Sequence, residues 1–408
     1  MSNTQDPPTS QLSNLPTHLP SASPPSPRTI ELDWLRGLAA LSVALGHCVT
    51  RTSPNLVYNK SVDEIDYSNG IDVAMRFLHI IFNADAAVVL FFVLSGHVLF
   101  ASLQRKSLTN FHSLSPSNSY SSSLSSLKLF WQSINLWKYL PVYVVRRLFR
   151  IYPVVISSFV VFAFFVPWDL MRLIENMLLW KVDLNGVTWS LQVELIGSLI
   201  VFFTWVFLNA IPRFPLLMPG ILIASCLWAM QAMNLFTYLP MFLMGCSISL
   251  YRNQFNHLLR PRSLRRTAIW TSIFIFLTAD FLIGKGSANV LIVGISATLI
   301  IAGIVATIHS DPLSPDTKLL RSNTVQFLGR VSYPFYLLHG AAIRFFFAVT
   351  IACSLDFKLI SPFEGWALLA VMTCAVALAS SWLIHIGIEK PGIKAGAWLT
   401  RKLNGGCG

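Results

Sequence analysis

Charged residues are scarce in this sequence. Only 12% of its 408 residues are Asp, Glu, Lys or Arg, whereas 54% are hydrophobic, and the mean hydropathy is +0.60. A soluble globular chain carries about 25% charged residues, so the composition excludes that class of protein. Apolar stretches of membrane-spanning length recur along the sequence and predict an all-α integral membrane protein.

Cysteine motifs and internal repeats are also missing. The six cysteines stand singly, mostly inside apolar stretches, at Cys48, Cys226, Cys246, Cys353, Cys374 and Cys407. Without CxxC or Cys/His spacing they predict no metal or redox centre, and we interpret most of them as small hydrophobic residues within helices. No internal repeat is visible, so the inverted-repeat signature of many secondary transporters is absent.

Acidic residues are fewer than basic ones, which gives a net charge of +12. Ten apolar stretches predict a ten-helix bundle, at 33–50, 86–102, 151–168, 188–211, 214–233, 235–251, 268–284, 289–308, 331–353 and 366–388. With both termini in the cytoplasm, the inside segments hold most Lys and Arg, and 102–150 and 252–266 contain no acid. This bias follows the positive-inside rule, so it indicates topology and attraction to lipid, and no nucleic-acid partner.

The first thirty residues have a different composition from the rest. The segment 1–30 is rich in Ser and Pro and has no apolar core region, so it predicts a disordered cytoplasmic tail and no signal peptide. We expect the transmembrane domain at 31–392 and a short basic cytoplasmic tail at 393–408.

The first apolar stretch, "LDWLRGLAALSVALGHCVT", contains Arg36 and His47. Eleven positions at about 100° each place both side chains on one helix face, about 16 Å apart along the axis. Arg36 alone is typical of an interfacial anchor, and His47 alone is typical of a hydrogen-bonded core histidine. Ionisable groups inside a membrane cost a few kcal/mol by insertion scales (about 3 kcal/mol), so their alignment favours a functional site.

Two further stretches carry charge next to apolar sequence. In "RRLFRIYP", Arg147 and Arg150 are either a positive-inside flank or a clamp for a cytoplasmic phosphate group, which guanidinium groups bind well. Pro153 is expected to kink this helix. In "TWSLQVEL", the carboxylate of Glu194 lies inside an apolar stretch and needs a partner.

Neighbours of these charges complete the candidate site. Ser190 shares a helix face with Glu194, and Trp189 can wall the same pocket. In the ninth stretch, Tyr336 and His339 are three residues apart and are expected to share a hydrogen-bond network. Several polar residues stay outside the site: Tyr333 and Arg344 as interfacial residues, Ser95, Gly96 and His97 as a packing segment, and Asp280 paired with Lys285.

Together these motifs resemble the acyltransferase-3 family of integral membrane acyltransferases. Six blocks occur in the family's order, namely "LDWLRGLAALSVALGH", "FFVLSG", "RRLFRIYP", "TWSLQVEL", "FLGRVSYPFYLLH" and "IEKP". The resemblance implies a ten-helix bundle that moves an acyl group, usually acetyl, from cytoplasmic acyl-CoA to a hydroxyl. The acceptor is commonly a glycan sugar and in some members a small metabolite, and the membrane implied is the cell membrane.

The resemblance also assigns roles. Arg36 and His47 match the family's signature pair, in which the histidine is catalytic, and Glu194, Tyr336 and His339 match further catalytic blocks. Arg147 and Arg150 match the basic motif that the family associates with the acyl-CoA donor, and Arg36 is expected to join them at the inner surface. Two departures leave the acceptor subclass open: His97 replaces a usual Phe, and 195–196 is apolar where polar residues are frequent.

The mechanism expected from these assignments has His47 as general base or as transient acyl carrier. Glu194 would orient an imidazole or the acceptor, and Tyr336 or Ser190 would donate a hydrogen bond to the oxyanion. Two alternatives remain open at this point. A proton-coupled multi-pass transporter also buries His, Glu and Arg along a path, and a scaffold without catalysis would tolerate the loss of His47.

Overall fold

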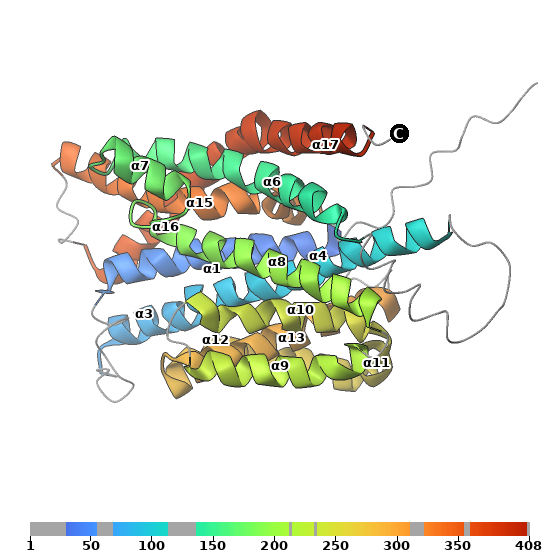
Figure 1. The fold of residues 1–408 in the computed structure, drawn as a ribbon. Helices are drawn as coiled ribbons and strands as arrows, with labels where there is room; N and C mark the ends of the chain where they lie inside the picture. The colour runs from blue at the N-terminus through green and yellow to red at the C-terminus, as the bar shows by residue number, and fades with distance from the viewer. Residues whose placement is uncertain are drawn as a thin grey trace, which may run out of the picture.

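The computed structural model describes residues 30–54, 68–112, 136–211, 214–231, 235–310, 322–354 and 360–405. Within these segments every regular element is a helix, and the helices lie side by side in one bundle (Figure 1). The all-α prediction is therefore confirmed. The predicted N-terminal tail up to residue 29 and Cys407 lie outside the described residues.

Ten helices match the predicted apolar stretches. They are α1 (Ile30–Thr52), α4 (Ala84–His112), α6 (Tyr139–Phe162), α8 (Trp189–Ala210), α9 (Phe214–Gln231), α10 (Leu239–Leu250), α12 (Arg262–Ile283), α13 (Ser287–Ser310), α15 (Asn323–Ala352) and α16 (Pro362–Ile384). Eight stretches of the described chain are long and apolar enough to cross a membrane. The other two are α10, which is short, and α6, which contains three arginines, so the ten-span count stays a prediction.

Shorter elements connect or flank these helices. They are α3 (Gly70–Ile81), α7 (Leu170–Met177), α11 (Arg252–Leu258), α17 (Lys390–Gly405), the 3-10 turns η2 (Gly186–Thr188) and η3 (Leu235–Tyr238), and the π-helical turn η5 (His385–Glu389). The end of α4, the start of α6 and α11 lie at one end of the bundle, whereas α3 and α7 lie at the other (Figure 1). The basic, acid-free segments therefore share one end; that it is the cytoplasmic end stays a prediction.

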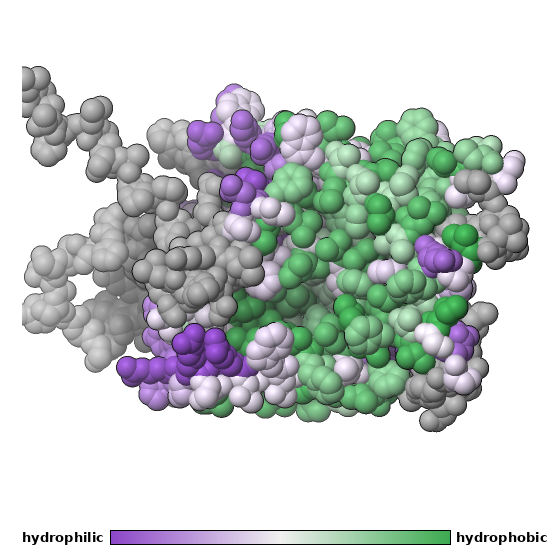
Figure 2. Space-filling model, turned by 180° about the vertical axis from the view of Figure 1, so that it is seen from behind, coloured by the Kyte–Doolittle hydropathy of each residue, from purple (hydrophilic) through white to green (hydrophobic). Residues whose placement is uncertain are grey.

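The outer surface of the bundle fits a lipid environment. Figure 2 shows apolar side chains over the middle of the visible face and hydrophilic residues toward its two ends. Large side chains such as Phe274 (62% exposed) and Val371 (67% exposed) point outward. The most apolar part of α12 is only 11% buried inside the protein. Such a surface would aggregate in water, whereas hydrocarbon solvates it.

Glycines allow the helices around the interior to approach closely. A Cβ atom on Gly96 of α4 would collide with the backbone of Phe242 in α10, and one on Gly329 of α15 would lie 2.6 Å from the carbonyl oxygen of Asp33 in α1. The prediction that Gly96 serves close packing is thus confirmed. The adjacent His97 is buried, and its Nδ1 lies 2.8 Å from the Ser249 hydroxyl, as expected of a packing residue.

Two helices extend further than the sequence indicated. α6 begins at Tyr139, so its arginines lie inside the helix and not at its start, and the helix continues through Pro153. α17 is a helix over most of the segment expected to be a tail. It packs on α6 through Gly392 and Gly396, where Cβ atoms would lie 2.9 Å from the carbonyl oxygen of Phe149 and 2.6 Å from its Cβ. This GxxxG spacing explains the close contact between the two helices.

Candidate active site

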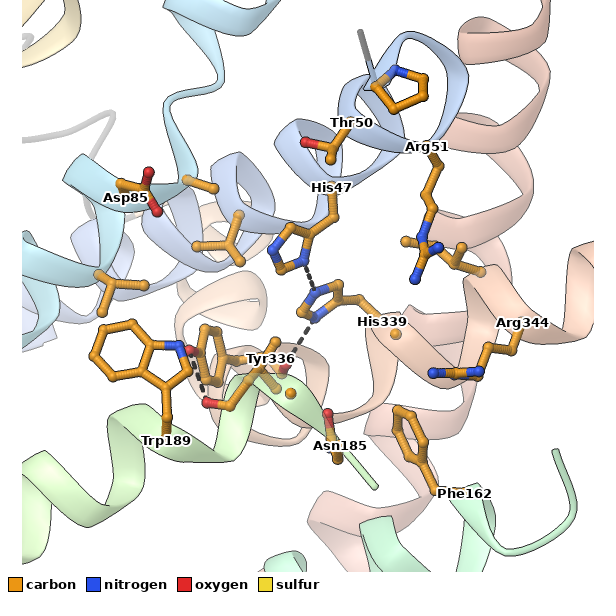
Figure 3. Close-up of a pocket in the computed structure, with 18 residues that line it drawn as sticks. His47, Thr50, Arg51, Asp85, Phe162, Asn185, Trp189, Tyr336, His339 and Arg344 are labelled. Carbon is orange, nitrogen blue, oxygen red and sulfur yellow. Dashed lines mark hydrogen bonds between the residues drawn. The ribbon is translucent and has the colours of Figure 1, made fainter. Parts of the chain in front are cut away.

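A cavity of about 520 Å³ lies between α1, α4, α15 and the turn that precedes α8; we call it the histidine cavity (Figure 3). Its polar lining consists of His47, Thr50, Arg51, Asp85, Asn185, Trp189, Tyr336, His339 and Arg344. Asn185 fixes the turn, because its amide donates a hydrogen bond to the carbonyl oxygen of Leu337 at 3.1 Å. Predicted site residues from three separate stretches therefore meet in one cavity.

The two imidazoles in this cavity are hydrogen-bonded to each other. His47 Nδ1 lies 2.8 Å from His339 Nε2, and His339 Nδ1 lies 2.7 Å from the backbone carbonyl oxygen of Tyr336. A carbonyl oxygen only accepts, so His339 Nδ1 carries the proton. In neutral His339 the Nε2 atom is then an acceptor, and His47 Nδ1 must be the donor to it.

This chain of hydrogen bonds fixes which nitrogen of His47 can act. With its proton on Nδ1, neutral His47 has its lone pair on Nε2, and Figure 3 shows this second nitrogen turned away from His339. Two adjacent imidazoles repel each other if both are charged, which favours at most one positive charge in the pair. His339 is thus placed to orient the ring of His47, in the way that a third group orients the general base of a catalytic triad.

A second cavity, of about 460 Å³, lies deeper along α1 toward its N-terminal end; we call it the arginine cavity. It is lined by four arginines and three carboxylates, namely Arg36, Arg147, Arg150, Arg330, Asp33, Glu194 and Glu389. Arg36 Nη1 lies 3.0 Å from Asp33 Oδ1, one helical turn earlier. The three arginines predicted to bind the donor are therefore brought together, and a fourth arginine joins them.

Glu194 belongs to the arginine cavity and does not line the histidine cavity. Its Oε1 atom forms an ion pair with Arg147 Nη2 and accepts a hydrogen bond from the Ser95 hydroxyl at 3.0 Å. Both polar partners thus lie on the arginine side, and a role of Glu194 in orienting an imidazole or the acceptor stays a prediction. Ser95, interpreted from the sequence as a packing residue, is one of those partners.

Tyr336 and Val88 line both cavities and form the partition between them. The Tyr336 hydroxyl lies 2.9 Å from the Ser190 hydroxyl and donates to the carbonyl oxygen of Val187 at 3.2 Å. The ring of Phe91 packs edge-on against Tyr336, with centroids 5.5 Å apart. The two hydroxyls predicted to donate to the oxyanion, those of Tyr336 and Ser190, are thus within hydrogen-bond distance of each other, and their role at His47 stays a prediction. The Tyr336 backbone carbonyl, and not its hydroxyl, is what contacts His339.

A third cavity, also of about 520 Å³, adjoins the histidine cavity through Asp85 and Trp189, which line both. Lys285 Nζ lies 3.0 Å from Asp85 Oδ2, an ion pair that the sequence did not indicate. Asp280 accepts a hydrogen bond from the Asn289 amide. Trp189 therefore lines two cavities, and its contact with a substrate stays a prediction.

Polar groups on the loop after α7 sit outside the membrane-spanning helices. Asp183 accepts hydrogen bonds from the Asn176 amide at 2.6 Å and from Arg172 Nε at 2.8 Å. These two donors, Asn176 first, hold the pKa of Asp183 below its usual value. The Asn176 amide oxygen also accepts from the backbone N–H of Leu184, so this network braces the turn that carries Asn185.

Several residues that line the cavities were not predicted from the sequence. Asn185 stands four residues before the Trp of "TWSLQVEL", and Glu389 is the acid of "IEKP", so each lay within or beside a recognised block. In the structure His385 Nδ1 lies 2.7 Å from Glu389 Oε2 across the π-helical turn η5, and both line the arginine cavity. π-helical turns are frequent at functional sites. Arg51 and Arg344 carried no signal beyond their charge.

Comparison with known proteins agrees with the motifs. A family model described as an acyltransferase domain matches residues 29–386, which is nearly the whole chain and includes most residues that line the cavities. No curated protein and no solved structure gives a significant match. The family match confirms the resemblance and favours an enzyme over a transporter or a scaffold. With its apolar, membrane-spanning helices, the chain therefore belongs to the acyltransferase-3 family and is an integral membrane acyltransferase.

Proposed function

We propose that this acyltransferase moves an acetyl group from acetyl-CoA, bound in the arginine cavity from the cytoplasm, to a hydroxyl of an acceptor in the histidine cavity. One observation carries the proposal: the two cavities meet at a partition one residue thick, formed by Tyr336 and Val88. A donor that enters through one cavity and an acceptor that enters through the other would meet beside His47.

The charges of the arginine cavity suit the phosphates of coenzyme A. Arg147 is only 8% exposed, and its Nε is a buried donor without a partner among the described residues. Arg150 likewise has no ion pair with a described carboxylate. Guanidinium groups bind phosphate oxygens with paired hydrogen bonds, and a phosphate would satisfy both residues. Glu194 then acts as the counter-ion that holds Arg147 in place.

The chemistry follows from the free nitrogen of His47. His47 Nε2 accepts the proton of the acceptor hydroxyl while the hydroxyl oxygen attacks the thioester carbonyl carbon. The tetrahedral oxyanion collapses, the carbon–sulfur bond breaks, and the coenzyme A thiolate takes the proton back from His47. The products are an ester and coenzyme A, and no other reactant is needed. His339 supports the step by accepting from His47 Nδ1–H, which becomes a stronger donor as the ring gains charge.

A covalent route starts at the same nitrogen. Here His47 Nε2 itself attacks the thioester, coenzyme A leaves, and the acyl-imidazole then passes the acyl group to the acceptor. The two routes differ in whether the protein carries the acyl group. Mass spectrometry of the intact enzyme directly after mixing with labelled acetyl-CoA and no acceptor separates them, because only the covalent route adds the mass of the acetyl group, and His47→Ala should abolish that addition.

On the acceptor side, we propose a carbohydrate or another small hydroxyl compound, and a cell membrane as the location. The ring of Trp189 and the polar groups of Asn185 and Thr50 face the histidine cavity, a mixture of aromatic and hydrogen-bonding groups suited to a polyhydroxylated molecule.

The test supplies labelled acetyl-CoA to purified membranes that contain the protein and identifies the modified compound by mass. His47→Ala should lower the rate of transfer by about 10²–10⁴, the usual contribution of a general base. His97→Ala is the matched control, because His97 is also a buried histidine but lies outside both cavities. Equal product from His47→Ala, or counterflow of a solute without acetyl-CoA, would contradict the proposal.

A further inference from the structure

Two arginines line the histidine cavity and have no place in the chemistry described above. Arg51 lies one helical turn after His47 in α1, and Arg344 lies five residues after His339 in α15. Both guanidinium groups lie on the same side of the imidazole pair, opposite Asp85 (Figure 3). The cavity therefore has a positive end, an acidic end and two imidazoles between them.

The positive end has no carboxylate partner in the part of the chain that the structure describes. Among these residues no Asp or Glu forms an ion pair with Arg51 or Arg344. The Arg344 guanidinium lies over the ring of Phe162, whose centroid is 5.8 Å from the guanidinium carbon. By contrast Arg36 and Arg147 of the arginine cavity each face a carboxylate. Asp85, the one carboxylate among the described residues that line the histidine cavity, pairs with Lys285.

An anchoring role does not account for this placement. An arginine that merely anchors a helix extends toward lipid headgroups at the membrane surface. Arg51 and Arg344 instead share a cavity wall, and their like charges oppose each other there. They also lie in the C-terminal parts of α1 and α15, and these parts point to the end of the bundle where α3 and α7 lie, away from the basic segments (Figure 1). The positive-inside rule predicts few cations at that end. An anion between them would remove the repulsion and engage both guanidinium forks.

We propose that the acceptor carries an anionic group, a phosphate or a carboxylate, which Arg51 and Arg344 bind. The acceptor would be anchored at the positive end of the histidine cavity and extend past the imidazole pair, so that its hydroxyl reaches His47 Nε2 on the side of Asp85 (Figure 3). The statement about the hydroxyl depends on the acetyl transfer proposed above, whereas the anion site does not. The specificity of the enzyme would then be for anionic hydroxyl compounds over neutral ones.

The anion site is tested without turnover by arginine footprinting. The full chain in phosphatidylcholine nanodiscs is treated with phenylglyoxal, and modification of each arginine is followed by peptide mass spectrometry with and without inorganic phosphate. Phosphate should slow modification of Arg51 and Arg344 by about fivefold or more, whereas chloride of equal ionic strength should not. Arg172 is the control, because its ion pair with Asp183 lies outside the cavity.

Three outcomes of the footprint would overturn the inference. Phosphate that leaves the two cavity arginines as reactive as before would show that they do not form an anion site. Low reactivity of Arg51 and Arg344 before phosphate is added would show that they are already paired. Protection by nanodiscs of phosphatidylglycerol without phosphate would assign the arginines to a lipid headgroup and not to the acceptor.

The acceptor preference is tested by kinetics with three matched compounds. Glycerol, glycerate and glycerol 3-phosphate differ in charge but share hydroxyls, and release of coenzyme A from acetyl-CoA reports transfer. The KM of at least one charged compound should be about tenfold or more below that of glycerol. Arg51→Gln and Arg344→Gln should remove this difference by raising the KM of the charged compounds.

The two proposals fail in different ways. A charge preference that is absent, or that survives in the Arg51→Gln/Arg344→Gln double variant, would overturn the anionic acceptor. Phosphate protection in the footprint together with no coenzyme A release from any acceptor would support the anion site and count against acetyl transfer.

Discussion

Replacing His339 tests the hydrogen-bond chain that fixes the catalytic nitrogen. Leu at this position fills similar space but accepts no hydrogen bond, so His47 Nδ1 loses its partner at 2.8 Å. A hydrogen bond to a group that becomes charged contributes about 1.5–3 kcal/mol, and each 1.36 kcal/mol corresponds to about tenfold in rate. His339→Leu should therefore lower kcat by about 10- to 150-fold.

The assay measures steady-state acetyl transfer with acetyl-CoA varied, so that kcat and KM are separated. His339 does not line the arginine cavity, so the KM for acetyl-CoA should stay within about twofold. His339→Gln places an amide oxygen near the position of Nε2 and should restore most of the lost kcat. Equal kcat values for the Leu and wild-type enzymes, or a change confined to KM, would refute this reasoning.

Three further predictions concern the framework around the site. Arg147→Met leaves the buried carboxylate of Glu194 without its ion-pair partner and should lower the free energy of unfolding in detergent by about 3 kcal/mol. The double variant Arg147→Met/Glu194→Gln should recover most of this stability but not the binding of the donor. Gly396→Val forces α17 away from α6 and should cost about 1–3 kcal/mol of unfolding free energy. The hydrogen bond from the Asn176 amide lowers the pKa of Asp183, so ionised Asp183 stabilises the folded protein above the unfolded pKa of about 3.9. This contribution to the free energy of unfolding is lost as pH falls below that value. The melting temperature of Asp183→Asn should therefore lie below that of the wild type at pH 7 and approach it below about pH 4.

Controls and contrary outcomes differ for each. If the double variant at Arg147 and Glu194 is no more stable than Arg147→Met, the unpaired carboxylate of Glu194 is not the cause of the lost stability. Ala395 is exposed on the other side of α17, so Ala395→Val should change stability by about 0.5 kcal/mol or less. An equal cost at Gly396 and Ala395 would contradict the glycine packing. A difference between wild type and Asp183→Asn that does not vary with pH would contradict the role of ionised Asp183.

Local sequence signals predicted most of the fold and many of the cavity residues. Hydropathy located the apolar helices, and helical periodicity placed Arg36 and His47 on one face of α1, each lining a different cavity. Hydropathy misplaced the start of α6, because Arg147 lowers the mean hydropathy of the first half of this helix although its side chain is buried inside the bundle. It also missed α17, which packs closely on α6 at Gly392 and Gly396.

Partners distant in sequence were beyond such reasoning. Glu194 needed a partner, but only the packing of α8 against α6 and α4 shows that Arg147 and Ser95 supply it. The contact between His47 and His339 joins residues 292 positions apart. The separation of the site into two cavities at Tyr336 likewise depends on how α15 crosses α1 and α8, and no local pattern encodes it.

Donor and acceptor are proposed to reach His47 from opposite cavities. This arrangement can be seen in a structure of the protein with acetonyl-CoA, a ketone analogue whose carbon–carbon bond cannot be cleaved by transfer. The phosphates should lie among Arg36, Arg147 and Arg150, with the ketone carbon past Tyr336 and in contact with His47 Nε2. Coenzyme A bound outside the arginine cavity, or a ketone that remains on the arginine side of Tyr336, would contradict it.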